Sequence, residues 1–212
     1  MSRQRQPATL EQFFKEFLTE SDRGAVGLAG SYVDQCLKEL IQKFFDKHAI
    51  ESKMIRHEHY HSWCRALLEN QRALGSFAVR CDLCVVLGLI DEVTYETIKE
   101  ISSMRNRDAH FAGPVKLDDS YITENIRKAV GEFSSNPKYP TMQFDSSEMV
   151  GMDEIVALWN QNSPKMHQSR KHLSFLVASS CWCIAKATQK ICDEISEARQ
   201  AIDRQEDDPN SQ

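Results

Sequence analysis

The sequence lacks an excess of positive charge. Lysine and arginine total 26 residues against 31 aspartates and glutamates, which gives a formal net charge of −5. Proteins that bind nucleic acid through phosphate contacts usually carry a basic surface, because counterion release supplies most of their non-specific affinity. The charge balance therefore argues against a dedicated DNA-binding domain and leaves room only for a local basic patch.

Long hydrophobic runs are also missing. The longest apolar stretch, residues 83–90 apart from one glycine, is far shorter than the about 20 residues of a transmembrane helix. The first residues, MSRQRQPATLEQ, do not contain the apolar segment of a secretory signal. The seven cysteines form an odd and irregularly spaced set, which is not typical of a disulfide framework. We therefore expect a cytoplasmic protein without a membrane segment.

Several motifs of enzymes and metal sites are absent or incomplete. The sequence has no glycine-rich phosphate loop, no serine in a nucleophile elbow and no evident carboxylate pair of a hydrolase. The run HEHYHSWC at 57–64 and the pair Cys81 and Cys84 contain zinc-binding residue types. Zinc ribbons, however, place such cysteine pairs in tight turns, whereas this pair lies in an apolar segment of helical character. We therefore expect no metal and no cofactor.

Helical periodicity is what the sequence does contain. In residues 22–46, small or apolar side chains recur at spacings of three and four, the period of an α-helix, namely at Val26, Gly30, Val33, Leu37, Leu40 and Phe44. The three glycines of this segment each cost roughly 1 kcal/mol in a helix relative to alanine. This cost predicts a compensating close contact, either with another helix or with a second subunit.

Residues 75–110 predict a helical hairpin. Ser76 opens the first helix, and Gly88, the residue type best suited to the left-handed C-terminal position, closes it. Asp91 is a natural N-cap for the second helix, which ends in the sequence RNRDAH at 105–110. This ending is the one segment in which side chains that could take part in catalysis are spaced so that they can lie close together.

The remaining segments predict further helices. A short amphipathic helix follows Thr9, and a helical segment carries Trp63, Leu67 and Leu68 into the core. More helices are expected over 120–130, 151–159 and 164–204, with a connecting loop over 134–147. The sequence contains no internal repeat and no β pattern.

These patterns together predict an all-α fold. We expect a single-domain bundle of about six to eight helices over residues 8–204, with a long C-terminal helix. A flexible N-terminus (1–7) precedes this domain, and a disordered acidic tail (205–212) follows it.

Two longer stretches resemble a known family. The runs GSFAVR, VVLGLI and IKEISSMRNRDAHF, together with the upstream run DRGAVGLAGSYVDQCLKELIQKFF, are similar to the mannitol operon repressor (MtlR) family. The resemblance extends over residues 22–111 and, less specifically, from 141 into the last helix. It implies an all-helical bacterial protein with a role in transcription regulation.

A shorter pattern resembles a second family. Arg105, Asn106 and His110 match the Arg-x4-6-His motif of HEPN domains, many of which are metal-independent RNases. The resemblance implies cleavage of RNA by its own 2′-hydroxyl across a dimer. His110 would then handle the proton, Arg105 would stabilise the charge on the phosphorus group, and Asn106 would orient His110 or a phosphate oxygen.

The same residues also have a structural interpretation. Arg105 continues the apolar stripe of its helix, so its side chain can reach inward to a carboxylate such as Asp82 or Asp34, while His110 caps the helix end. Arg80 and Asp82 are the two charged residues of the preceding apolar helix, and with Arg105 they are assigned structural roles.

The sequence therefore leaves two main functions open. One is a regulator of the MtlR family that acts through a protein partner or a homodimer. The other is a dimeric HEPN-type endoribonuclease, a toxin or defence component, with RNA as its partner. A plain scaffold is a third role. Direct DNA reading is disfavoured, because the second helix of the hairpin opens with the acidic sequence DEVTYETIKE.

Overall fold

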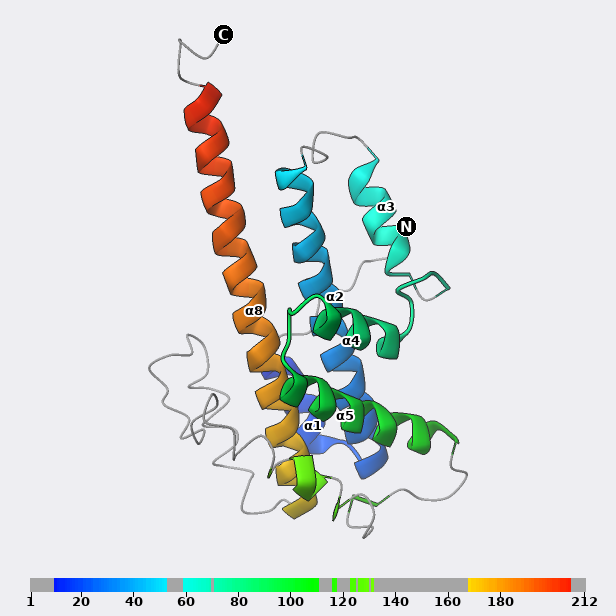
Figure 1. Ribbon diagram of the computed structural model, residues 1–212. Helices are drawn as coiled ribbons and strands as arrows, with labels where there is room; N and C mark the ends of the chain where they lie inside the picture. Colours follow the sequence, from blue (N-terminus) through cyan, green and yellow to red (C-terminus); the bar gives the residue numbers. More distant parts are fainter. Residues whose placement is uncertain are drawn as a thin grey trace. The chain divides into compact units, whose positions relative to one another are not determined.

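The part of the chain described by the computed structural model is helical. It comprises residues 10–52, 59–69, 71–110, 116–117, 123–124, 126–129, 131 and 168–206. The helices are α1 (Leu10–Thr19), α2 (Asp22–Glu51), α3 (Tyr60–Leu67), α4 (Phe77–Val86), α5 (Glu92–His110) and α8 (Gln168–Glu206) (Figure 1). No strand occurs in these ranges. The all-α prediction and the long C-terminal helix are confirmed.

Several predicted features fall outside these residues. They are the N-terminal segment 1–7, the loop over 134–147, the helix over 151–159, the start of the last helix at Pro164 and residues 207–212 of the predicted tail, whose first two residues belong to α8. Within the predicted helix over 120–130, the described residues 123–124 and 126–129 are helical. None of the helices in the described ranges is long and apolar enough to cross a membrane.

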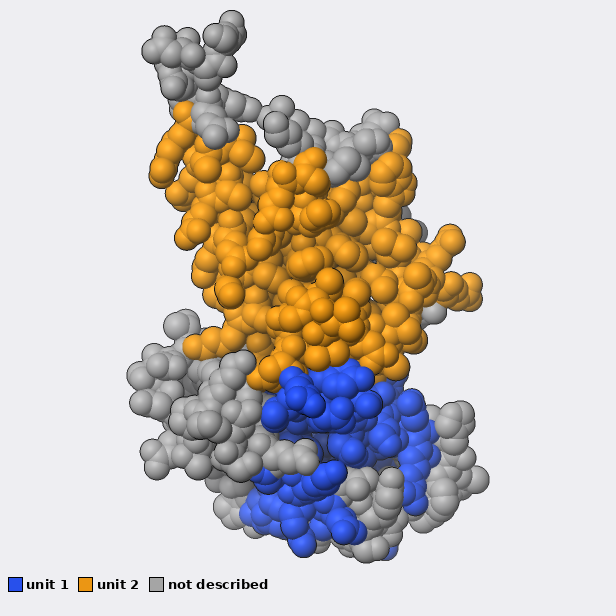
Figure 2. All heavy atoms as spheres, in the orientation of Figure 1, with its two compact units in different colours: residues 1–35, 92–180 blue, residues 36–91, 181–212 orange. Residues whose placement is uncertain are grey.

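The chain divides into two compact units. Unit 1 comprises residues 1–35 and 92–180, and unit 2 comprises residues 36–91 and 181–212 (Figure 2). Helices α1 and α5 belong to unit 1, and α3 and α4 belong to unit 2, while α2 and α8 each contribute residues to both. The predicted single domain over 8–204 stays a prediction.

The core of unit 1 comes from α1, α5 and its portions of α2 and α8. The Phe13 ring of α1 stacks on Tyr32 of α2, with ring centroids 4.6 Å apart. Large apolar side chains contribute roughly 1.5–3 kcal/mol each when fully buried, so contacts of this kind hold the unit together. Its buried members include Phe17, Val26, Val33, Ile98, Ile101, Leu173 and Val177.

The core of unit 2 comes from α3, α4 and the other portions of α2 and α8. Its buried members include Leu37, Leu40, Ile41, Cys64, Phe77, Cys81, Cys84, Ile184 and Ile191. The predicted ends of α4 are confirmed. Ser76 is the N-cap and its hydroxyl accepts a hydrogen bond from the Val79 amide at 3.2 Å. Gly88 has a φ of 66°, the left-handed conformation that glycine adopts most readily.

Two predictions about side chains and helix ends are wrong. The helix predicted over 22–46 continues to Glu51, because Ala49 and Ile50 extend its buried face. Trp63 and Leu67 do not join the core and are 50% and 41% exposed. The buried face of the eight-residue α3 is formed instead by Cys64, while the half-buried Tyr60 donates its hydroxyl to the Phe45 carbonyl at 2.6 Å. Trp63 lies about 100° from Cys64 around the helix and therefore faces outward.

Candidate protein-interaction surface

Arg105, the first residue of the HEPN-like pattern, packs against α2 within unit 1. It is half-buried, and a Cβ atom added to Gly30 would lie 2.6 Å from the Arg105 Cδ. The aliphatic part of the arginine therefore occupies the space that glycine leaves beside α2. The prediction that the glycines permit close helix packing is confirmed at Gly30. No described atom lies within 4 Å of the corresponding position at Gly27.

The structure says less about the roles of Asn106 and His110, the other two residues of this pattern. Asn106 is exposed on α5, and His110 is the last residue of that helix. The side chain of His110 lies outside the described part of the structure. The catalytic roles of Arg105, Asn106 and His110, and the predicted pairing of Arg105 with Asp82 or Asp34, stay predictions.

Arg80 is almost completely buried in unit 2. It is 1% exposed, and its guanidinium Nη1 donates a hydrogen bond to the Leu74 carbonyl, which ties α4 to the loop before it. Asp82, two residues later, is exposed. A buried arginine needs such acceptors, because an unpaired buried charge is strongly destabilising.

The cysteine pair on α4 is part of the core. Cys81 and Cys84 are both buried. Burial raises the pKa of the Cys84 thiol to about 12, although the positive charge of Arg80 opposes this shift. A thiol of this kind stays protonated at neutral pH and is neither a good nucleophile nor a ready metal ligand. Among the described residues, no three or more His, Cys, Asp or Glu side chains are grouped closely enough to hold a metal ion.

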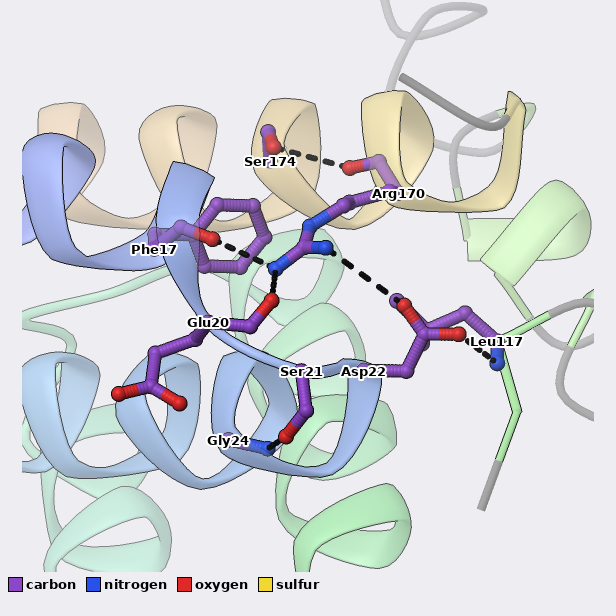
Figure 3. Close-up of polar contacts among 8 residues, drawn as sticks. All are labelled: Phe17, Glu20, Ser21, Asp22, Gly24, Leu117, Arg170 and Ser174. Carbon is purple, nitrogen blue, oxygen red and sulfur yellow. Dashed lines mark hydrogen bonds and ion pairs between the residues drawn. The ribbon is translucent and has the colours of Figure 1, made fainter. Parts of the chain in front are cut away.

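A prominent cluster of polar contacts in unit 1 surrounds Arg170 at the start of α8 (Figure 3). Its Nη2 atom donates to the Phe17 carbonyl at 2.7 Å and to the Glu20 carbonyl, both at the C-terminal end of α1. Its Nη1 atom lies 3.7 Å from the Asp22 carboxylate. The other oxygen of Asp22 accepts a hydrogen bond from the Leu117 amide at 3.1 Å. A cation at the end of a helix stabilises its free carbonyls.

This cluster has the properties of a structural clasp. Its contacts are directed at backbone carbonyls and at one carboxylate that itself accepts a backbone hydrogen bond (Figure 3). The Arg170 guanidinium also lies over the Phe17 ring, 5.4 Å from its centroid. The sequence does not reveal this cluster, because Arg170 and Phe17 are 153 positions apart.

The large hydrophobic side chains that are exposed all lie in unit 2, as far as the chain is described. We call them the α3–α4 surface and define it as Trp63, Leu67, Val79, Val86 and Leu87. Val86 is 81% exposed, the highest value of the five. Single exposed hydrophobic residues are common on protein surfaces, but several of them on two adjoining elements are typical of an interaction site.

Backbone and side-chain contacts connect the two halves of the α3–α4 surface. The Leu74 amide donates to the Leu67 carbonyl at 3.0 Å, which returns the chain to the end of α3 just before α4 begins. The Leu74 carbonyl in turn accepts the hydrogen bond from Arg80. The buried arginine therefore fixes α4 relative to the end of α3, and the surface is held by the core beneath it.

The exposed side of α4 carries little charge. Its exposed residues are Ala78, Val79, Asp82 and Val86, of which one is charged. The part of α8 in the same unit has the opposite character, because Lys186, Lys190 and Glu197 are among its exposed residues. The exposed side of α4 thus presents two valines, Val79 and Val86, with Asp82 between them.

Helical periodicity missed this surface for a simple reason. Phe77, Cys81 and Cys84 satisfy the expected buried face of α4. The remaining apolar residues, such as Val79 and Val86, add no contradictory signal. The sequence FAVRCDLCVV, with Arg80 and Asp82 as its charged residues, gives no local sign that Val79 and Val86 are exposed.

Comparison with known proteins gives one structural likeness. No family model matches the sequence, and no curated protein matches it. The chain is similar to a chain in the X-ray structure of the MtlR–HPr complex from Escherichia coli, with a TM-score of 0.53 and 17% sequence identity. The match covers 81% of this chain and 98% of that chain. At this identity the likeness shows the fold alone, which is MtlR-like.

Proposed function

We propose that this protein is a regulator of the MtlR type that acts by binding a protein partner and has no enzymatic activity. The observation that carries the proposal is the set of large apolar side chains exposed on and beside α3 and α4, because such a set is typical of a protein-binding site. The MtlR-like fold supports it, since a protein of that fold has been crystallised with a protein partner.

The partner we propose is HPr or a protein of the same kind from the organism that makes this chain. HPr is the partner present in the complex whose fold this chain resembles. The α3–α4 surface suits a globular partner with an apolar patch of its own. Trp63 is the best anchor on this surface, because tryptophan contributes strongly to binding when its ring is covered.

Regulation through a partner also agrees with the charge of the chain. The net charge of −5 provides no general attraction to DNA. Helix α5, the second helix of the hairpin, begins at Glu92 and carries Glu96 one turn later. Acidic residues at this end of a helix repel phosphates and do not suit a recognition helix. We therefore propose that any effect on transcription passes through the bound protein.

The test is a titration of the purified chain with HPr from the same organism, followed by calorimetry. We expect saturable binding that Val86→Asp weakens at least about tenfold, because the new carboxylate is desolvated in the complex. Ala185→Asp is the matched control, since it adds the same charge at an exposed position of α8 in the same unit. This control should bind as the unmodified chain does.

Two results would contradict the proposal. One is equal weakening by Val86→Asp and Ala185→Asp, which would remove the α3–α4 surface from the interaction. The other is a salt-sensitive, sequence-specific gel shift by the chain alone, which would make it a direct DNA reader.

A further inference from the structure

Two cysteines from distant parts of the sequence meet inside unit 2. Cys36 lies on α2 and Cys181 lies on α8, 145 positions later, and their Sγ atoms are 3.9 Å apart. A disulfide bond is about 2.05 Å long. The two sulfurs therefore need to approach by roughly 2 Å to form this bond.

The two thiols have different surroundings. Cys36 is half-buried, whereas Cys181 is buried. The hydrogen bond from Cys36 and burial both raise the pKa of Cys181, so this thiol stays protonated in the resting protein. A peroxide therefore reaches the less buried Cys36 first, whereas Cys181, a protonated thiol and a poor nucleophile on its own, reacts only with the sulfur that it touches.

We propose that Cys36 and Cys181 form a reversible disulfide when the protein meets a hydroperoxide. In the first step the Cys36 sulfur attacks the peroxide, an S–O bond forms and the O–O bond breaks. One oxygen stays on Cys36 as a sulfenic acid, and the other leaves as an alcohol or as water. In the second step the Cys181 sulfur attacks the Cys36 sulfur, the S–S bond forms and the S–O bond breaks. The departing oxygen leaves as water with the Cys181 proton.

The balance is two thiols and one hydroperoxide giving one disulfide, one alcohol and one water. The two sulfurs are oxidised and the peroxide is reduced. The product links α2 to α8 within the unit that carries the α3–α4 surface. This inference does not depend on HPr binding, because it rests on the two sulfur positions alone.

The experiment treats the reduced full-length protein with one equivalent of hydrogen peroxide, then quenches it with acid and alkylates the free thiols. Peptide mass mapping should find one cross-linked pair that joins the Cys36 and Cys181 peptides, with the loss of two hydrogens, and dithiothreitol should reverse it. The oxidised protein should also unfold at a higher temperature, since a cross-link across 145 positions constrains the unfolded chain.

Three variants sharpen the test. Cys36→Ala should prevent the cross-link and leave Cys181 as an unmodified thiol. Cys181→Ala should leave a sulfenic acid on Cys36 that dimedone traps. Cys192→Ala, which removes another half-buried cysteine of α8, should leave the cross-link unchanged. If Cys181→Ala does not fold, a comparison of Cys36→Ala with the unmodified protein still shows whether the cross-link requires Cys36. A cross-link that persists in Cys36→Ala, or peroxide treatment that yields no Cys36–Cys181 pair, would overturn the proposal.

Discussion

The described residues of the two units differ in the small polar side chains that they bury and in the large apolar side chains that they expose. In unit 1 the described residues turn polar groups inward, with Thr94, Thr97, Ser174, Ser179 and Ser180 all buried. In unit 2 large apolar groups are turned outward, at Trp63, Leu67, Val79, Val86 and Leu87.

A buried polar group is stabilised by local partners, and both terminal nitrogens of the Arg170 guanidinium have hydrogen-bond or ion-pair partners in the clasp of unit 1. An exposed apolar group forgoes the stabilisation that burial provides, and we propose that a partner covers the set in unit 2. We therefore propose a structural role for the clasp in unit 1 and a recognition role for the α3–α4 surface in unit 2.

The largest effect we expect comes from two aromatic residues, one in each unit. Phe17→Ala should lower the free energy of unfolding by about 3–5 kcal/mol, because Phe17 is fully buried and also lies beneath Arg170. Trp63→Ala should lower it by less than about 1 kcal/mol, because half of its surface is already exposed. Urea denaturation of both variants measures the difference. Equal losses would mean that Trp63 belongs to the core after all.

The clasp in unit 1 should show the next largest effect. Arg170→Met keeps the long side chain but removes the donors to the Phe17 and Glu20 carbonyls and the pairing with Asp22. We expect a loss of about 2–4 kcal/mol in the free energy of unfolding. Arg204→Met is the control at an exposed position of the same helix and should change stability by less than about 0.5 kcal/mol. Stability that is unchanged in Arg170→Met would show that the clasp contributes nothing.

A smaller effect separates two glycines of α2. Gly27→Ala should stabilise the protein by about 0.5–1 kcal/mol, because alanine favours the helix and no described atom lies near the new methyl group. Gly30→Ala should destabilise it by about 1–2 kcal/mol, because the methyl group collides with the Arg105 stem. The urea midpoints should therefore move in opposite directions. A stabilising Gly30→Ala would mean that Arg105 is free to move aside.

The last prediction concerns RNA, and here we expect no measurable effect, because the chain should not cleave it. A mixed RNA pool incubated with the chain in EDTA should stay intact, and His110→Ala should behave as the unmodified chain does. Arg105→Ala should alter stability alone, since the described contact of Arg105 is its packing on Gly30. Cleavage that leaves cyclic phosphate ends and disappears in a folded His110→Ala variant would reverse this assignment and make the protein an enzyme.

Much of the fold could be predicted because its signals are local. Ser76 and Gly88 mark the ends of α4 through backbone preferences that need no distant partner. The period of α2 locates its buried residues, and Gly30 indicates a close helix contact.

The remaining features depend on distant partners or on a short helix. The short helix α3 buries the side chain of Cys64, and its sequence pattern does not show that Cys64 rather than Trp63 is the buried residue. The clasp around Arg170 and the meeting of Cys36 with Cys181 join residues about 150 positions apart, and no local pattern can report such contacts. The α3–α4 surface was not predicted, because a largely apolar helix such as α4 is normally interpreted as buried.

The most direct test of the central claim is amide hydrogen exchange of the chain with and without saturating HPr from the same organism. The account predicts slower exchange confined to residues 60–90, with the amides of α5 near residues 105–110 unchanged. Protection at residues 105–110 without any change in α4 would contradict it, because recognition would then belong to unit 1.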